Sequence, residues 1–169
     1  RQKMINLMYV VLMAMLALKV STEVLDGFSI VEDSLNRTTA NSSAENNAIY
    51  SDFADQMKQN PTKVREWFEK AKQVKDMSDA LYNFAQELKV AIVKEADGKN
   101  GDVSNIKNKE NLEAAGIVML APGTGKGKKL YRELNRYRDR ILELVTDEHQ
   151  KKIIASNFST QVHKSEKYL

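Results

Sequence analysis

The sequence predicts an all-α protein, in which one N-terminal transmembrane helix continues into an antiparallel periplasmic four-helix bundle. Two observations lead to this fold class. Residues 4–18 form an apolar run in which only Asn6 and Tyr9 carry polar side-chain groups. Beyond residue 23, apolar residues recur at steps of three and four, the period of an amphipathic helix. We assign residues 1–22 to the anchor and residues 23–169 to the bundle.

The apolar run is close to the minimum length of a membrane span. A helix needs roughly 17–25 mainly apolar residues to cross about 30 Å of hydrocarbon. The run reaches this length if Lys3 and Lys19 extend along the helix and place their ammonium groups at the two interfaces. A signal peptide is one alternative, although no small-x-small cleavage site follows the run. A buried core helix is the other.

Charged residues around the run predict its orientation. Arg1 and Lys3 precede it, whereas four acidic residues and Lys19 follow it before the next arginine. Because Lys and Arg bias sets topology, we expect the N-terminus in the cytoplasm and the bundle in the periplasm, with the chain in a bacterial inner membrane. The chain begins with Arg rather than Met and ends within a helical pattern, so we expect a longer natural protein.

The first two helices of the bundle have clear boundaries. The pair Asn60-Pro61 ends the first and begins the second, because Asn is a favoured N-cap and Pro fits the first helical turn. Gly98 ends the second in a left-handed conformation. Trp67 belongs to the apolar stripe of the second helix, so we expect it to be buried. The first helix carries a stripe that begins with Val24, Phe28, Val31 and Leu35.

The second half of the chain begins with a loop. Six of the seven glycines lie between Gly98 and Gly127, which predicts a long loop around residues 98–127. Its short apolar piece, residues 117–120, is either a strand or a segment docked on the bundle. Two further amphipathic helices follow, the last capped by Thr146 or Asp147 and extending to Val162. Four long segments with short links within each pair predict the antiparallel bundle.

Composition excludes several classes of protein. The chain has 169 residues, which leaves about 140 for one soluble domain with a single core. Its formal net charge of +3 is too small to imply a nucleic-acid partner. It contains no cysteine, so it has no disulfide, thiolate metal site or cysteine nucleophile.

The motifs give no support for catalysis. The stretch Gly123-Thr124-Gly125-Lys126-Gly127 lacks the Gly-Lys-Ser/Thr ending of a phosphate-binding loop. His149 and His163 are about 21 Å apart along one predicted helix, so they cannot share a metal within it. We therefore expect no enzyme activity, no cofactor and no metal.

The polar and small residues of the predicted span are its candidate contact residues. At 100° per residue, three small residues and one asparagine lie within about 80° of each other on one side of the helix. Small residues permit close helix packing, and asparagine can hydrogen-bond across helices. This helix-packing side consists of Asn6, Ala14, Ala17 and Ser21. Tyr9 lies between that side and Arg1, and an interfacial aromatic anchor is its other interpretation. Between Lys3 and Glu23 there is no acidic residue, so the span has no carboxylate to carry a proton.

The first twenty-eight residues resemble a known family. The string Arg1-Gln2-Lys3-Met4-Ile5-Asn6-Leu7-Met8-Tyr9, then Ala14-Met15-Leu16-Ala17-Leu18, Glu23-Val24-Leu25 and Phe28, is similar to the N-terminus of the GldM/PorM family. This family belongs to the type IX secretion and gliding motility machinery of Bacteroidetes. The later Lys126-Gly127-Lys128, Leu130 and Tyr137-Arg138 are also similar. Lys19 departs from the pattern, because the family usually has Asn there.

The resemblance implies a subunit of a motor driven by the protonmotive force. Family members form homodimers whose two membrane helices sit inside a ring of GldL-type subunits and pass motion through the periplasm to outer-membrane components. On that pattern Arg1 is the counter-ion of a membrane glutamate of the ring, and Tyr9 is a second polar contact. The implied partners are therefore the ring subunit, a second copy, further secretion components and membrane lipid. A membrane-anchored sensor and a passive scaffold are the alternatives.

Overall fold

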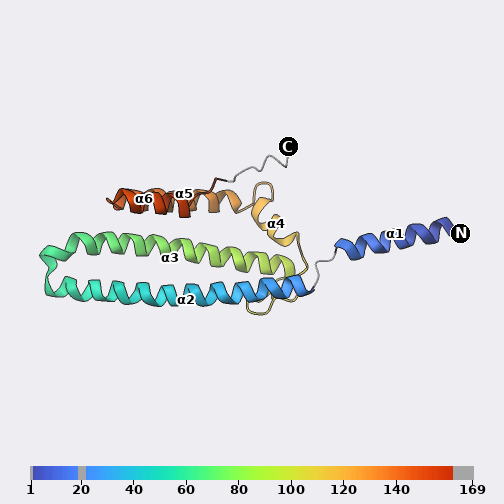
Figure 1. The fold of residues 1–169 in the computed structure, drawn as a ribbon, viewed down its shortest axis with the longest axis horizontal. Helices are drawn as coiled ribbons and strands as arrows, with labels where there is room; N and C mark the ends of the chain where they lie inside the picture. Colours follow the sequence, from blue (N-terminus) through green and yellow to red (C-terminus); the bar gives the residue numbers. More distant parts are fainter. Residues whose placement is uncertain (1, 19–21, 162–169) are drawn as a thin grey trace.

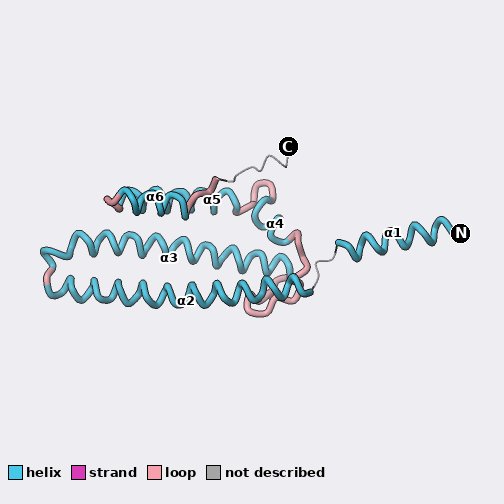
Figure 2. The backbone as a smooth tube through the Cα atoms, in the orientation of Figure 1, coloured by secondary structure: helices cyan, strands magenta, loops and turns pink. Residues whose placement is uncertain are grey.

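The computed structural model describes residues 2–18 and 22–161, and it is all-helical over these ranges. The described residues contain six helices and no strand (Figures 1 and 2). The predicted all-α class is therefore confirmed. The helices are α1 Gln2–Leu18, α2 Thr22–Gln59, α3 Pro61–Asp97, α4 Ala114–Leu120, α5 Gly127–Leu144 and α6 Glu148–Asn157.

Helices α2 and α3 form a long antiparallel hairpin (Figure 1). They contain 38 and 37 residues, so each is about 56 Å long. Pro61 opens α3 as predicted, although the Asn60 side chain makes no capping hydrogen bond. Gly98 ends α3 with a φ of 88°, and its N–H donates to the Lys94 carbonyl. Because L-residues rarely adopt that φ, the predicted glycine stop is confirmed.

The helices pack in an open row, and a closed four-helix bundle is not confirmed. Helix α2 packs on α3, α3 on α5, and α5 on α6. Within the described residues, no close backbone approach between α6 and α2 completes a fourth side. The short apolar piece near residue 117 is a helix, α4, which docks against α3 and α5. Asp147 caps α6 by accepting the Gln150 N–H at 2.7 Å, and Val162 lies outside the described residues.

The core of the domain is small. Among the described residues the buried apolar side chains are Leu88, Val93, Ala114 and Ile141. They come from the C-terminal half of α3, from α4 and from α5, so the core lies where these three helices meet. Trp67, which the apolar stripe of α3 placed in the core, is 56% exposed. That prediction is wrong: α2 packs on the neighbouring Phe68, whose ring stacks on Tyr50, and leaves Trp67 exposed. The Lys70 ammonium lies 4.9 Å from the Trp67 ring centroid.

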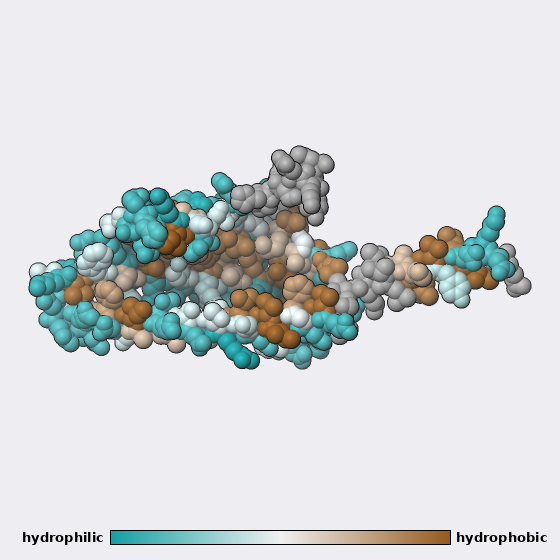
Figure 3. Space-filling model, viewed as in Figure 1, coloured by the Kyte–Doolittle hydropathy of each residue, from teal (hydrophilic) through white to brown (hydrophobic). Residues whose placement is uncertain are grey.

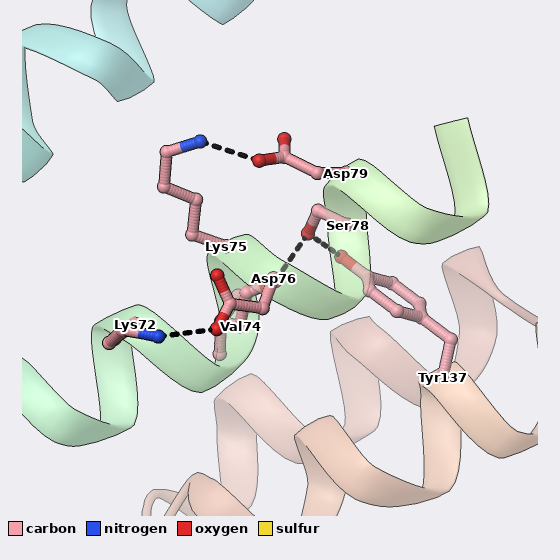
Figure 4. A network of polar contacts seen from close by, with 7 residues as sticks. All are labelled: Lys72, Val74, Lys75, Asp76, Ser78, Asp79 and Tyr137. Carbon is pink, nitrogen blue, oxygen red and sulfur yellow. Dashed lines mark hydrogen bonds and ion pairs between the residues drawn. The ribbon is translucent and has the colours of Figure 1, made fainter. Parts of the chain in front are cut away.

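A polar contact joins α3 to α5. The Tyr137 and Ser78 hydroxyl oxygens lie 2.8 Å apart, and Ser78 also donates to the Val74 carbonyl (Figure 4). Beside them, the ion pairs Lys72–Asp76 and Lys75–Asp79 run along α3 itself. Such exposed pairs within one helix contribute little to stability, because water screens them. The link between α3 and α5 therefore depends on the Tyr137–Ser78 contact and the surrounding apolar packing.

Helix α1 differs from the predicted span. It contains 17 residues and contacts no other helix in the described part of the chain. No helix in the described residues has both the length and the apolar character needed to cross a membrane. Residues 19–21, at which we expected the span to continue into α2, lie outside the described residues.

Candidate assembly surfaces

The predicted contact residues of the N-terminal segment are only partly described. Helix α1 carries Asn6, Tyr9 and Ala14 on its exposed surface, and Tyr9 is 64% exposed. Helical spacing brings Asn6 and Ala14 within about 80° of each other, as expected. Ala17 lies in α1, but its side chain is outside the described part, as are Arg1 and Ser21. Of the predicted contact residues, the structure therefore describes the side chains of Asn6, Tyr9 and Ala14, all exposed on one helix.

Helix α1 exposes apolar side chains on every side. Seven of its residues are 64–74% exposed, including Met8 and Met13. Apolar surface of this extent requires cover by lipid or protein, because contiguous exposed apolar patches mark interaction sites. In Figure 3 the described part of this helix is largely brown, with hydrophilic residues near its N-terminal end.

The first half of α2 presents a second apolar surface, which we name the α2 seam. It consists of Val24, Phe28, Val31 and Leu35, which are 49%, 68%, 54% and 61% exposed. Their spacing of four, three and four residues keeps them on one side of the helix, as in the seam of a coiled coil. Figure 3 shows apolar side chains gathered along the first half of α2. The sequence displays this stripe directly, and the structure adds that its side chains lie outside the core.

A third surface, which we name the cap, comprises residues 98–129. The Asp97 carboxylate accepts the backbone N–H groups of Lys107 and Asn108, each at 2.8 Å, and so folds this segment back on the end of α3. These two hydrogen bonds stabilise the ionised form and hold the pKa of the Asp97 carboxyl below its usual value. The Lys109 ammonium reaches the Ser29 hydroxyl of α2 at 3.4 Å. The cap therefore joins the end of α3 to the beginning of α2.

The glycine-lysine stretch, residues 123–127, packs tightly against the end of α4. The Gly125 N–H donates to the Ala121 carbonyl, and the Lys126 N–H donates to the Val118 carbonyl. A Cβ at Gly125 would lie 2.7 Å from the Met119 carbonyl oxygen, so only glycine fits there. These two amides bond to the end of α4 and cannot also cradle a phosphate.

A groove of about 470 Å³ lies between α3 and α5. Its floor includes Leu81 and Phe84, and the Lys129 ammonium lies 4.5 Å from the Phe84 ring centroid. Glu87 and Glu133 also line it. Within the described residues, no three His, Cys, Asp or Glu side chains gather as a metal site.

We infer from these surfaces that the chain is a helical subunit of a larger assembly. Among the described residues, four apolar side chains are buried, whereas 24 large apolar side chains are exposed. The sequence profile described as the GldM N-terminal domain matches residues 23–168. The chain therefore belongs to the GldM family, and its role is in the gliding and type IX secretion machinery. A comparison with curated proteins gives no match.

Proposed function

We propose that the chain is an inner-membrane subunit of a protonmotive-force-driven motor, which transmits motion through the periplasm for type IX secretion and gliding. The observation that carries the proposal is the family match over residues 23–168. The shape of the domain is consistent with transmission, because the α2–α3 hairpin is a rod about 56 Å long.

The proposed anchor is the segment of residues 1–22, of which α1 is the helical part. Helix α1 measures about 26 Å along its axis, slightly less than the hydrocarbon thickness of about 30 Å. A short hydrophobic helix is accommodated by local thinning of the bilayer and by flanking side chains that reach the interface. The exposed apolar surface of α1 favours lipid and a membrane partner as its cover.

The proposed partner inside the membrane is a ring of GldL-type subunits. The chain has no acidic residue between Lys3 and Glu23, so a proton-carrying carboxylate would have to come from the partner. Arg1 would pair with that carboxylate, and Tyr9 would provide a second polar contact. A guanidinium favours the ionised acid and lowers its pKa. Protonation would then release the contact and couple proton passage to relative motion.

The proposed oligomer is a homodimer, with a second copy covering the α2 seam. Four apolar side chains at heptad spacing are a continuous surface for a parallel partner helix. In the membrane, the side that includes Asn6 and Ala14 would permit close approach of the two anchors. Further periplasmic and outer-membrane components would receive the motion from the domain.

A transport assay on Arg1 variants tests the motor. We expect Arg1→Ala to abolish secretion and gliding while protein level and complex formation persist. Arg1→Lys should retain part of the activity, because it keeps the charge and loses the two-donor fork. Lys3→Ala is the matched control, since a residue that only sets topology should tolerate the loss of one charge. Full activity in Arg1→Ala would remove Arg1 from the mechanism and favour a passive scaffold.

A further inference from the structure

The cap carries the excess positive charge of the chain. Residues 98–129 contain six lysines and three acidic residues. The whole chain has 26 basic and 23 acidic residues, so the rest of it is electrically balanced. All six of these lysines are exposed: Lys99, Lys107, Lys109, Lys126, Lys128 and Lys129.

The cap also exposes apolar side chains among these lysines. Leu112 is 69% exposed, Ile117 is 45% exposed and Leu120 is 79% exposed. In α4, Ile117 and Leu120 lie one turn apart and are both exposed, whereas Ala114 is buried. Exposed leucines beside lysines are typical of surfaces that lie at a lipid interface.

The cap lies at the end of the domain from which the chain reaches its anchor. Helix α3 runs antiparallel to α2, so the end of α3 and the loop after it lie beside the start of α2 (Figure 1). Lys109 contacts Ser29, which is about 10 Å along α2 from its first residue, Thr22. If residues 1–22 are in a membrane, the cap is the part of the domain that faces it.

We propose that the cap docks on the anionic surface of the bilayer, with its lysines on lipid phosphates and with Leu112 and Leu120 at the level of the headgroups. This inference rests on the proposed anchoring of residues 1–22. Charge favours lipid over a second copy of the chain, because two caps of net positive charge repel each other. Contact with the bilayer would fix the tilt of the α2–α3 hairpin relative to the anchor.

Site-specific labelling of the full chain in vesicles tests the docking. Because the chain has no cysteine, single substitutions give clean attachment of an environment-sensitive fluorophore. Leu120→Cys reports on the cap, and Lys58→Cys, in the last turn of α2 at the opposite end of the hairpin, is the control. Val11→Cys reports separately on the anchor. The probe membranes are vesicles of phosphatidylglycerol with phosphatidylcholine or of phosphatidylcholine alone, each with brominated lipid as quencher.

We expect the label at position 120 to shift to shorter wavelength and to be quenched in anionic vesicles only. High salt or the double substitution Lys126→Gln/Lys128→Gln should remove the quenching, because the attraction is electrostatic. The label at position 58 should stay unquenched. A wavelength shift at position 120 without quenching would assign the cap to a protein partner or a second copy and overturn the docking, as would equal quenching in neutral vesicles.

The label at position 11 separates this inference from the proposed anchor. Quenching at position 11 without quenching at position 120 would retain the anchor and overturn the docking. Quenching at position 120 alone would overturn the anchor and retain the lipid contact of the cap. Absence of quenching at both positions would overturn both.

Discussion

The Asp97 carboxylate holds the cap against the end of α3 through two hydrogen bonds. Two backbone N–H groups depress its folded-state pKa below the ordinary value of about 3.9. Its contribution to stability is therefore present above that value and is lost as the pH falls through the lower folded-state pKa. We expect Asp97→Asn to lower the thermal midpoint at neutral pH and to flatten its decline below about pH 4.

Thermal unfolding followed by circular dichroism over a series of pH values checks this prediction. Glu45→Gln, which removes an exposed carboxyl from α2, is the control and should follow the unchanged protein. If the Asp97 and Glu45 variants have the same pH profile, Asp97 does not hold the cap in solution.

Trp67 and Ile141 show how burial decides the cost of a substitution. Trp67 is 56% exposed and Ile141 is 9% exposed. We expect Trp67→Ala to change the free energy of unfolding by less than about 1 kcal/mol, because surface substitutions are usually mild. Ile141→Ala should cost about 2–5 kcal/mol through lost burial and the cavity left behind. Urea unfolding of the two variants compares them, and a larger cost at Trp67 would show that a partner or another helix covers it.

At the level of elements, helix α2 carries the seam that we assign to a second copy. We expect Phe28→Asp to weaken self-association about tenfold or more, because truncating a central aromatic at an interface typically costs over 1 kcal/mol. Ile30→Asp is the matched control. Ile30 is 70% exposed but lies about 100° or more around the helix from each residue of the seam. Sedimentation equilibrium measures both, and equal weakening by the two would remove the seam as the interface.

The ends of the helices were predictable from sequence, but their packing was not. Pro61 and Gly98 act through local backbone restrictions, which a sequence displays directly. An apolar stripe shows only that one face of a helix avoids water, and it does not identify what covers that face. Phe28 and Trp67 both lie on such stripes, and both are exposed, although we expected Trp67 to be buried. The same limit applies to α1: its helical spacing was predictable from sequence, but what covers its apolar surface was not.

The docked position of α4 shows a second limit of the sequence. Seven residues are too few for a helical period to be distinguished from a buried strand. What fixes α4 is its packing on α3 and α5, together with the close approach of Gly125 to Met119. Both are contacts between segments, which no local pattern in residues 114–127 displays.

At the level of the whole molecule, the exposed area is the most informative quantity. A compact monomer of 19.2 kDa exposes about 8,400 Å², whereas this chain exposes 14138 Å². The open row of helices and the separate α1 both add to the difference. A single copy therefore buries less apolar surface than a domain of this size usually needs, and the proposed association would supply the remainder.

Stability that comes from association depends on concentration. A partner that binds only the folded state raises the unfolding midpoint as its concentration rises. We therefore expect the thermal midpoint of the full chain in detergent micelles to increase with protein concentration at a fixed detergent-to-protein ratio. Phe28→Asp should remove most of this dependence and Ile30→Asp should leave it, because only Phe28 lies on the α2 seam. A midpoint that is independent of concentration in the unchanged chain would show that the open row is stable as a monomer, and that the seam serves a partner other than a second copy.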